Sequence, residues 1–187
     1  NNDFRSDMAI SFDPTKNLPS SGNGGAILTD NIGLYNYALN YRSNGTTSEF
    51  RQIGTNSRMS EIDCAHMMVR TKYIDSWQAK REQITNYWLD EFKDLPVMCM
   101  ADTSDDPTVR HAYHKFVLYV NDRRSLKTHL LLNGIDTKFH YEKTLGEMPA
   151  YSHLPKPDLL SMSVMLSRGV ISLPLYPELT DNEIEYI

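Results

Sequence analysis

Apolar residues recur at steps of three or four between residues 60 and 92, except between Trp77 and Ile84, where the stem of Lys80 or Arg81 fills the gap. This spacing predicts a long amphipathic helix, and Ser60 is placed to begin it as the N-cap. A helix of that length in a small chain often joins two structural units, so we expect folded parts on both sides of it. The apolar face of the predicted helix consists of Ile62, Ala65, Val69, Tyr73, Trp77, Ile84, Trp88 and Phe92.

Shorter patterns flank this segment and alternate between strand and helix. Before it, we expect a buried strand at residues 7–12, a second strand at 26–29 and a helix at 31–42. Thr180 and Glu183 have the spacing of a capping box, which predicts a helix start. This order favours an α/β fold. After the long helix, strands are expected at 114–120, 135–141 and 170–173, and helices at 123–133 and 159–168.

The overall composition excludes several classes of protein. With 40% hydrophobic and 23% charged residues, the chain is in the ordinary globular range, and it has no apolar run long enough to span a membrane. Its net charge of −5 is unfavourable for nucleic-acid binding. Cys64 and Cys99 are too few for a disulfide framework, so we expect a cytoplasmic protein with reduced thiols. Four histidines lack a metal-ligand spacing, and we expect no metal site; they are His111, His114, His129 and His153.

The segment with the clearest chemical content is 11–26, SFDPTKNLPSSGNGGA. Lys16 lies in a turn just after a predicted strand, and its amine could form a Schiff base. Ser11, five residues earlier, offers a hydroxyl that could bind a phosphate. Taken alone, a lysine in a turn is usually a solvated surface residue, so this pattern needs support from elsewhere in the chain.

That support is a resemblance in the order of several motifs. SFDPTKNL followed by GNGGAILTD is similar to the active-site lysine signature of the DegT-type sugar aminotransferases. These are enzymes dependent on pyridoxal 5′-phosphate (PLP), with the aspartate aminotransferase-like fold of type I. Further segments resemble the family in the same order: GTNSRMSEIDCA (54–65), HAYHKFVLYV (111–120), GIDTKFHYEKTLGEMPAY (134–151) and LSRGVISLPLYPELTDNEIEYI (166–187).

The resemblance implies a role for each of six residues. Lys16 would bind PLP covalently and act as the catalytic base, and Ser11 would bind the cofactor phosphate. Asn56 would reach that phosphate from the neighbouring subunit, which implies a homodimer. The remaining positions would line the nucleotide-sugar site, where their donors suit a diphosphate; they are Arg58, His140 and Tyr141.

Simpler structural roles remain open for four of these residues. Asn56 could cap the turn before the long helix. Arg58 could be an exposed charge at the helix start. His140 and Tyr141 lie at the end of a predicted strand, where a structural histidine and a half-buried tyrosine are common.

The resemblance also implies a fold and a domain organisation. The fold would be the C-terminal part of an α/β PLP-dependent transferase. Residues 1–59 would be a remnant of the PLP-binding large domain, 60–101 the connecting helix, and 102–187 the small C-terminal α/β domain, with a boundary in the polar segment 102–110. Family members are about twice as long, so we expect both ends to be interior cuts and the missing half to precede Asn1.

The implied function is transfer of an amino group, with glutamate as the expected donor, to a keto-sugar nucleotide. Such a reaction supplies amino sugars for surface polysaccharides or glycosylated metabolites. Retention of Lys16 counts against the related dehydratases, which carry histidine there. The alternative is a non-catalytic fragment or interaction module that oligomerises without turnover.

Overall fold

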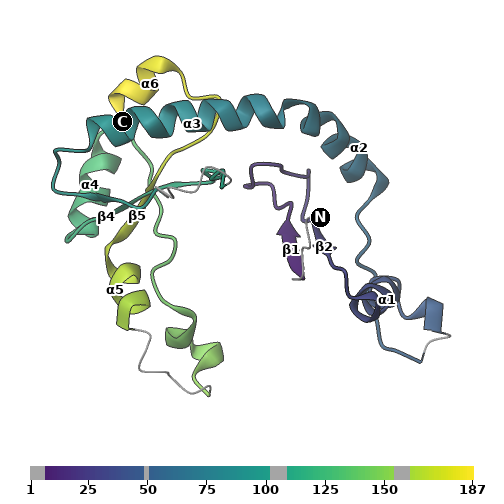
Figure 1. Cartoon of the computed structure of the whole chain (residues 1–187). Coiled ribbons are helices and arrows are strands. Elements are labelled where there is room, and N and C mark those ends of the chain that lie inside the picture. The colour runs from purple at the N-terminus through teal and green to yellow at the C-terminus, as the bar shows by residue number, and fades with distance from the viewer. Residues whose placement is uncertain (1–6, 49–50, 102–108, 154–160) are drawn as a thin grey trace. The chain divides into compact units, whose positions relative to one another are not determined.

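A computed structural model describes residues 7–48, 51–101, 109–153 and 161–187 (Figure 1). The chain divides into two compact units, Asn1–Asp75 and Ser76–Ile187. The division falls near the start of α3 (Ile74–Glu91). Most of the predicted polar boundary at 102–110 lies outside the described residues, as does the start of the predicted helix at 159–168.

The first unit begins with a β-hairpin. Strand β1 (Met8–Ser11) pairs antiparallel with β2 (Gly25–Leu28), with Ser11 opposite Gly25. A Cβ at Gly25 would lie 2.8 Å from the carbonyl oxygen of Ile10, so only glycine fits this pairing. Both strands were predicted, but the expectation that the first is buried is wrong. Its side chains are mostly exposed, because a two-stranded ribbon has no second layer of described residues to pack against.

Two helices follow the hairpin, and the second begins at the predicted cap, Ser60. Asn31 precedes α1 (Ile32–Tyr41), and its side chain accepts hydrogen bonds from the amides of Gly33 and Leu34. After a short 3₁₀ turn, Thr46–Ser48, the chain reaches α2 (Glu61–Arg70). Ser60 caps that helix, since its hydroxyl accepts from the amide of Asp63 at 3.1 Å.

The predicted long helix is present but is interrupted once. A 3₁₀ turn, Thr71–Tyr73, separates α2 from α3. The hydroxyl of Thr71 donates to the carbonyl of Met68 at 2.9 Å, a bond back to the preceding turn that accompanies this change in winding. The predicted apolar face is exposed at Ile62 and Val69 and is buried further on, in α3.

The second unit has a three-stranded antiparallel sheet in the order β3-β4-β5. The strands are Met98–Cys99, Phe116–Tyr119 and Val170–Leu173. Trp88 of α3 packs edge-on against Phe116 at 5.1 Å between ring centroids, and its indole N–H donates to the carbonyl of Ile184. The buried core consists of Ile84, Trp88, Phe116, Leu118, Val120, Ile171, Leu173, Leu175, Leu179 and Ile184.

Three further helices complete this unit: α4 (Arg123–Leu132), α5 (Ser161–Gly169) and α6 (Asp181–Tyr186). The capping box predicted at the start of α6 is confirmed, because Thr180 and Glu183 exchange side chain-to-backbone hydrogen bonds. Two single 3₁₀ turns, Leu145–Glu147 and Pro149–Tyr151, lie between α4 and α5.

The predicted strand at 135–141 is wrong. Only Lys138 bridges to β5, at Ser172, and no ladder forms on either side of that pair. The next residue, Phe139, packs its ring under the guanidinium of Arg123, 4.1 Å from the ring centroid, rather than pairing with β5. Strand β3, which consists of two residues, was not predicted.

A buried arginine connects α3 to the segments around the sheet. Arg81 donates hydrogen bonds to the carbonyl oxygens of Tyr113, at 3.2 Å, and Leu175, at 2.8 Å. Tyr113 has a left-handed backbone conformation, with φ of 41°, just before β4. Burial lowers the pKa of Arg81, and Glu178 partly offsets this shift.

Candidate active site

Lys16 lies in a tight turn at the end of the hairpin formed by β1 and β2. The carboxylate of Asp13 accepts hydrogen bonds from the backbone amide and the hydroxyl of Thr15, at 2.8 and 2.6 Å. The amide of Lys16 donates to the carbonyl of Asp13 at 2.9 Å. These bonds form an aspartate-initiated turn that fixes the backbone, while the half-buried side chain of Lys16 makes no ion pair with any described carboxylate.

Ser20 closes the base of the same loop. It is 1% exposed, and both its amide and its hydroxyl donate to the carbonyl of Phe12 at 2.8 Å. Phe12 in turn donates its amide to the carbonyl of Gly24. A Cβ at Gly24 would lie 2.9 Å from the Met59 methyl group, so this glycine lets the residue before α2 pack against the loop.

Arg70, at the end of α2, holds the loop from the other side. Its Nη1 atom donates to the carbonyl oxygens of Pro19, at 2.8 Å, and Ser20, at 3.2 Å. Sequence reasoning missed both Arg70 and Ser20 because the motif resemblance draws attention to the lysine alone. The only available signal was an arginine at the last position of a helix, where a cation is common for other reasons.

Ser11 shares the hairpin end with Lys16. It is the last residue of β1, its side chain is exposed, and its hydroxyl accepts from the amide of Asp13 at 3.3 Å. The hydroxyl proton therefore remains available to a ligand. The two predicted residues thus flank the Asp13 turn at the same hairpin end.

Asn56 and Arg58 belong to a second segment of the same unit. Residues 54–57 run antiparallel to 41–44, with Thr55 and Ser57 donating their amides to the carbonyls of Tyr41 and Arg42. The side chains of Asn56 and Arg58 are exposed. Ser60 caps α2 as predicted, and the alternative role of Asn56 in the turn before that helix stays a prediction.

His140 and Tyr141 lie in the second unit, after the Lys138 bridge. His140 is half-buried, and its Nδ1 atom is 2.9 Å from the hydroxyl of the buried Ser172 of β5. Tyr141 is 68% exposed and meets the imidazole edge-on. A structural role therefore accounts for the orientation of His140, whereas the phenol of Tyr141 is open to a ligand.

The described ranges contain no cluster of three or more residues suited to a metal ion. Within the same ranges, every helix is too short or too polar to cross a membrane.

Comparison with known proteins adds the decisive observation. Residues 3–187 match the model of the DegT/DnrJ/EryC1/StrS aminotransferase family. The chain belongs to this family. The predicted resemblance is therefore confirmed over almost the whole chain.

Members of the DegT/DnrJ/EryC1/StrS family with moderate identity cover nearly all of this chain. It is 31% identical over 182 residues to the erythromycin biosynthesis sensory transduction protein EryC1 of Saccharopolyspora erythraea, covering 96% of this chain and 49% of that protein. It is 32% identical over 174 residues to dTDP-3-amino-3,4,6-trideoxy-alpha-D-glucose transaminase of Streptomyces venezuelae, covering 91% and 45%. The chain spans about half the length of these curated relatives.

Solved DegT/DnrJ/EryC1/StrS structures confirm the fold. DesV of S. venezuelae aligns with a TM-score of 0.86 and 29% identity over 97% of this chain and 49% of DesV. NtdA of Bacillus subtilis, solved with bound pyridoxamine phosphate, aligns with a TM-score of 0.81 and 25% identity over 96% of this chain and 43% of NtdA. The predicted architecture, part of a PLP-dependent transferase, is therefore confirmed.

Proposed function

We propose that this chain provides the lysine loop and the small domain of a PLP-dependent aminotransferase that acts on a keto-sugar nucleotide. The observation that carries the proposal is the hairpin end, where Lys16 and Ser11 share one loop and Arg70 fixes its backbone. The names of the relatives support the substrate class, because several are transaminases of dTDP- or UDP-linked sugars.

The residues of the loop fit the cofactor. PLP has an aldehyde and a phosphate, and the loop offers a primary amine on Lys16 and a hydroxyl on Ser11. The Lys16 amine is not paired with any described carboxylate, and the Ser11 hydroxyl is exposed. When bound, PLP supplies an electron sink for the electrons of the breaking C–H bond.

The protein's own contribution would be binding, orientation and proton transfer. Lys16 would hold the cofactor covalently and then use its Nζ atom to remove and return a proton at the substrate carbon. Ser11 would donate to the cofactor phosphate. The Asp13 turn and Arg70 would limit the movement of Lys16, which reduces the entropy lost when the reacting atoms meet.

The remaining predicted residues would bind substrate or complete the site of a second subunit. Arg58 would donate charge-assisted hydrogen bonds to a diphosphate, and His140 and Tyr141 would contact the sugar nucleotide. Asn56 would reach the cofactor phosphate of the partner subunit, and a homodimer would follow. In this assignment residues 1–59 are the cofactor part, 60–101 the connection and 102–187 the small domain.

The test is covalent trapping of the cofactor on the purified chain. The protein is incubated with PLP, reduced with borohydride, digested and examined by mass spectrometry. We expect a phosphopyridoxyl group on Lys16, and we expect it to be absent from the Lys16→Ala variant. Lys72→Ala is the matched control, because Lys72 is an exposed lysine of the same unit and should leave the labelling unchanged.

A turnover assay separates the enzyme from the alternative. Chain that labels at Lys16 is supplied with glutamate and a dTDP- or UDP-linked keto sugar, and 2-oxoglutarate is measured. A folded chain that sediments as an oligomer but takes up no PLP would favour the non-catalytic interaction module.

A further inference from the structure

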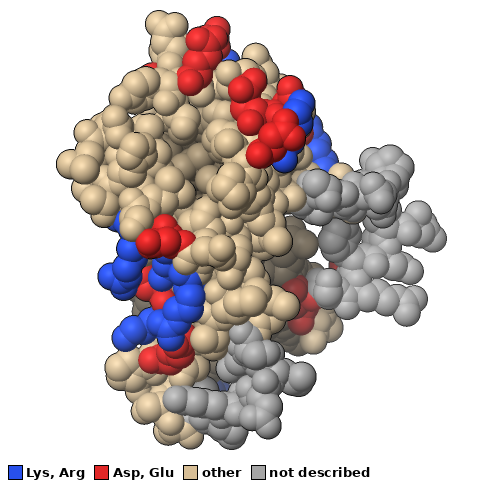
Figure 2. All heavy atoms as spheres, turned by 90° about the vertical axis from the view of Figure 1, so that its left-hand side faces the viewer, with Lys and Arg blue, Asp and Glu red and all other residues tan. Residues whose placement is uncertain are grey.

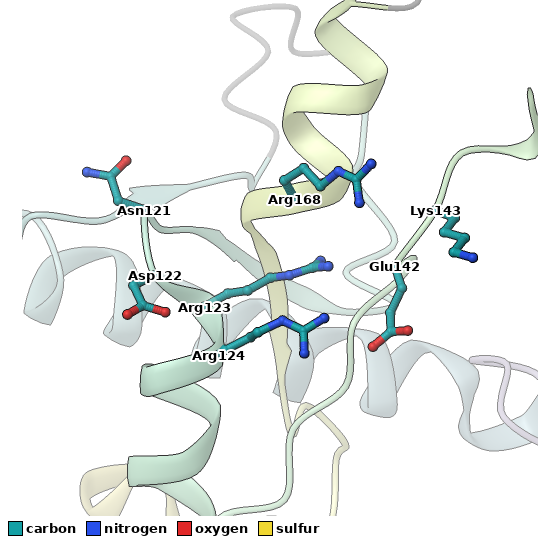
Figure 3. A pocket seen from close by; sticks show the side chains of 7 residues that line it. All are labelled: Asn121, Asp122, Arg123, Arg124, Glu142, Lys143 and Arg168. Atoms are coloured by element: carbon teal, nitrogen blue, oxygen red, sulfur yellow. The ribbon is translucent and has the colours of Figure 1, made fainter. Parts of the chain in front are cut away.

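The second unit contains a recess lined by basic side chains. Arg123 and Arg124 begin α4, Arg168 lies in the last turn of α5, and Lys143 lies in the intervening loop. The recess has a volume of about 260 Å³. Figure 3 shows the side chains of Arg123 and Arg124 extending in the same direction, with Arg168 above them and Glu142 and Lys143 on the segment that they face.

This concentration of cations contrasts with the chain as a whole, which carries a net charge of −5. Figure 2 shows the side of the molecule on which α4 and α5 lie, with a cluster of lysine and arginine side chains that has acidic side chains among and beside it. A local excess of one sign in an otherwise acidic protein attracts ligands of the opposite sign.

Four cations line the recess, against two carboxylates in the lining and Glu147 beside it, so a small positive excess remains. Asp122 is occupied as the cap of α4, since its two oxygens accept from the amide and the hydroxyl of Ser125 at 3.1 and 2.7 Å. Glu147 pairs with Arg168 at 2.5 Å. Neither Arg124 nor Lys143 forms an ion pair with a carboxylate of the described residues, so Glu142 is the remaining acidic group in the lining.

Arg123 is held in place before any ligand arrives. It is 5% exposed, donates from Nη1 to the carbonyl of Val170 at 3.1 Å, and stacks on Phe139. Burial lowers the pKa of Arg123, Glu142 raises it, and the neighbouring Arg124 and Arg168 lower it again. Like charges are therefore held close together, and a bound anion would reduce the free-energy cost of their repulsion.

We propose that this recess binds a small phosphate-class dianion, either inorganic phosphate or the phosphate group of a small metabolite. Arginine side chains match the geometry of phosphate oxygens through paired N–H donors. The volume is below the roughly 300 Å³ at which pockets for drug-sized ligands begin, which suits a small anion. Because Asp122 already caps α4, binding would depend on the side chains rather than on the helix amides.

This inference does not depend on the proposed aminotransferase activity, because none of the residues assigned to that activity lines the recess. It is tested by isothermal titration calorimetry of the full chain at constant ionic strength. The probes are inorganic phosphate, pyrophosphate and glycerol phosphate, and comparison of the three distinguishes a free anion from an esterified one. We expect saturable binding of at least one probe to one site. For glycerol phosphate we expect binding to strengthen as the pH rises through the second phosphate pKa, which is about 6.

Variants of exposed side chains make the test specific. Arg124→Ala and Lys143→Ala should each weaken binding about tenfold, the loss typical of one hydrogen bond from a charged group. Glu142→Gln should strengthen it, because the remaining carboxylate of the lining is neutralised. Lys93→Ala removes the same charge outside the recess and should have no effect. Absence of saturable binding by the unaltered chain, or equal binding by folded Arg124→Ala protein, would overturn the proposal.

Discussion

Arg70 donates a hydrogen bond of 2.8 Å to the carbonyl oxygen of Pro19, three residues after the candidate catalytic lysine. The same Nη1 atom reaches the carbonyl of Ser20 at 3.2 Å. The end of α2 therefore fixes the backbone of the lysine loop although 51 positions separate the two residues in the sequence.

Replacing Arg70 with alanine should loosen this loop without unfolding α2. Two carbonyl groups lose a charged donor, and the expected cost is about 1–3 kcal/mol of local stability. The measurement is hydrogen exchange of the amides at residues 16–22, which should accelerate. Lys72→Ala, an exposed lysine in the turn that follows α2, should leave that exchange unchanged. Equal exchange rates in the Arg70 variant and the unaltered chain would show that the loop is stable without the hydrogen bonds from Arg70.

Substitutions at Asn56 and Ser60 should affect two different properties, cofactor binding and stability. Ser60 caps α2, so Ser60→Ala should cost about 1 kcal/mol of stability and leave PLP affinity nearly unchanged. Asn56 caps no helix and is exposed, so Asn56→Ala should weaken PLP binding and leave stability unchanged. Urea denaturation and PLP titration of both variants check this. If Asn56→Ala lowered stability and left PLP binding unchanged, Asn56 would not belong to the proposed site.

Gly169 should tolerate no larger residue while Tyr119 is beside it. A Cβ at this position would lie 2.3 Å from the half-buried Tyr119 ring, so the ring would have to shift. Gly169→Ala should therefore destabilise the second unit by about 1–3 kcal/mol. Chemical denaturation gives the value, and Tyr119→Leu in the same chain should restore part of it. Gly22→Ala is the control, because no atom lies within 4 Å of the added methyl group.

The capping box of α6 should contribute to stability in a pH-dependent way. The amide and the hydroxyl of Thr180 donate to the Glu183 carboxylate and lower its pKa below the usual value. A depressed carboxyl pKa gives stability that is fully present above the unfolded-state pKa and is lost as the pH falls through the folded-state pKa.

Glu183→Gln tests this directly. The variant should be less stable than the unaltered chain at neutral pH, and the difference should shrink in acid, where both side chains are uncharged. Denaturation midpoints at the two pH values provide the measurement. A difference that stays constant with pH would mean that the carboxylate charge adds nothing to the cap.

The features that could be predicted from the sequence depend on local chemistry. Ser60 and Thr180 cap their helices as predicted, because a capping side chain lies within a few residues of the amides that donate to it. Strand β5 was predicted with its observed bounds from a short β-branched run that ends before Pro174.

The features that could not be predicted depend on distant partners. Residues 135–141 have the composition of a strand, but Phe139 binds under Arg123 instead of extending the pairing at Lys138. Ile62 was assigned to the apolar face of the predicted long helix, but its side chain is 80% exposed. In the candidate site, the lysine loop was recognised from its motif. Its hydrogen bonds from Arg70 could not be predicted, because no local sequence pattern indicates them.

The buried guanidinium of Arg81 has a consequence for how the second unit unfolds. Its partners are two backbone carbonyls, Tyr113 just before β4 and Leu175 just after β5. If either segment detached alone, a cation would remain in a poorly solvated place with half of its acceptors gone. Partial opening is therefore penalised, and α3, β4 and β5 are expected to melt as a single cooperative unit whose amides share one exchange free energy.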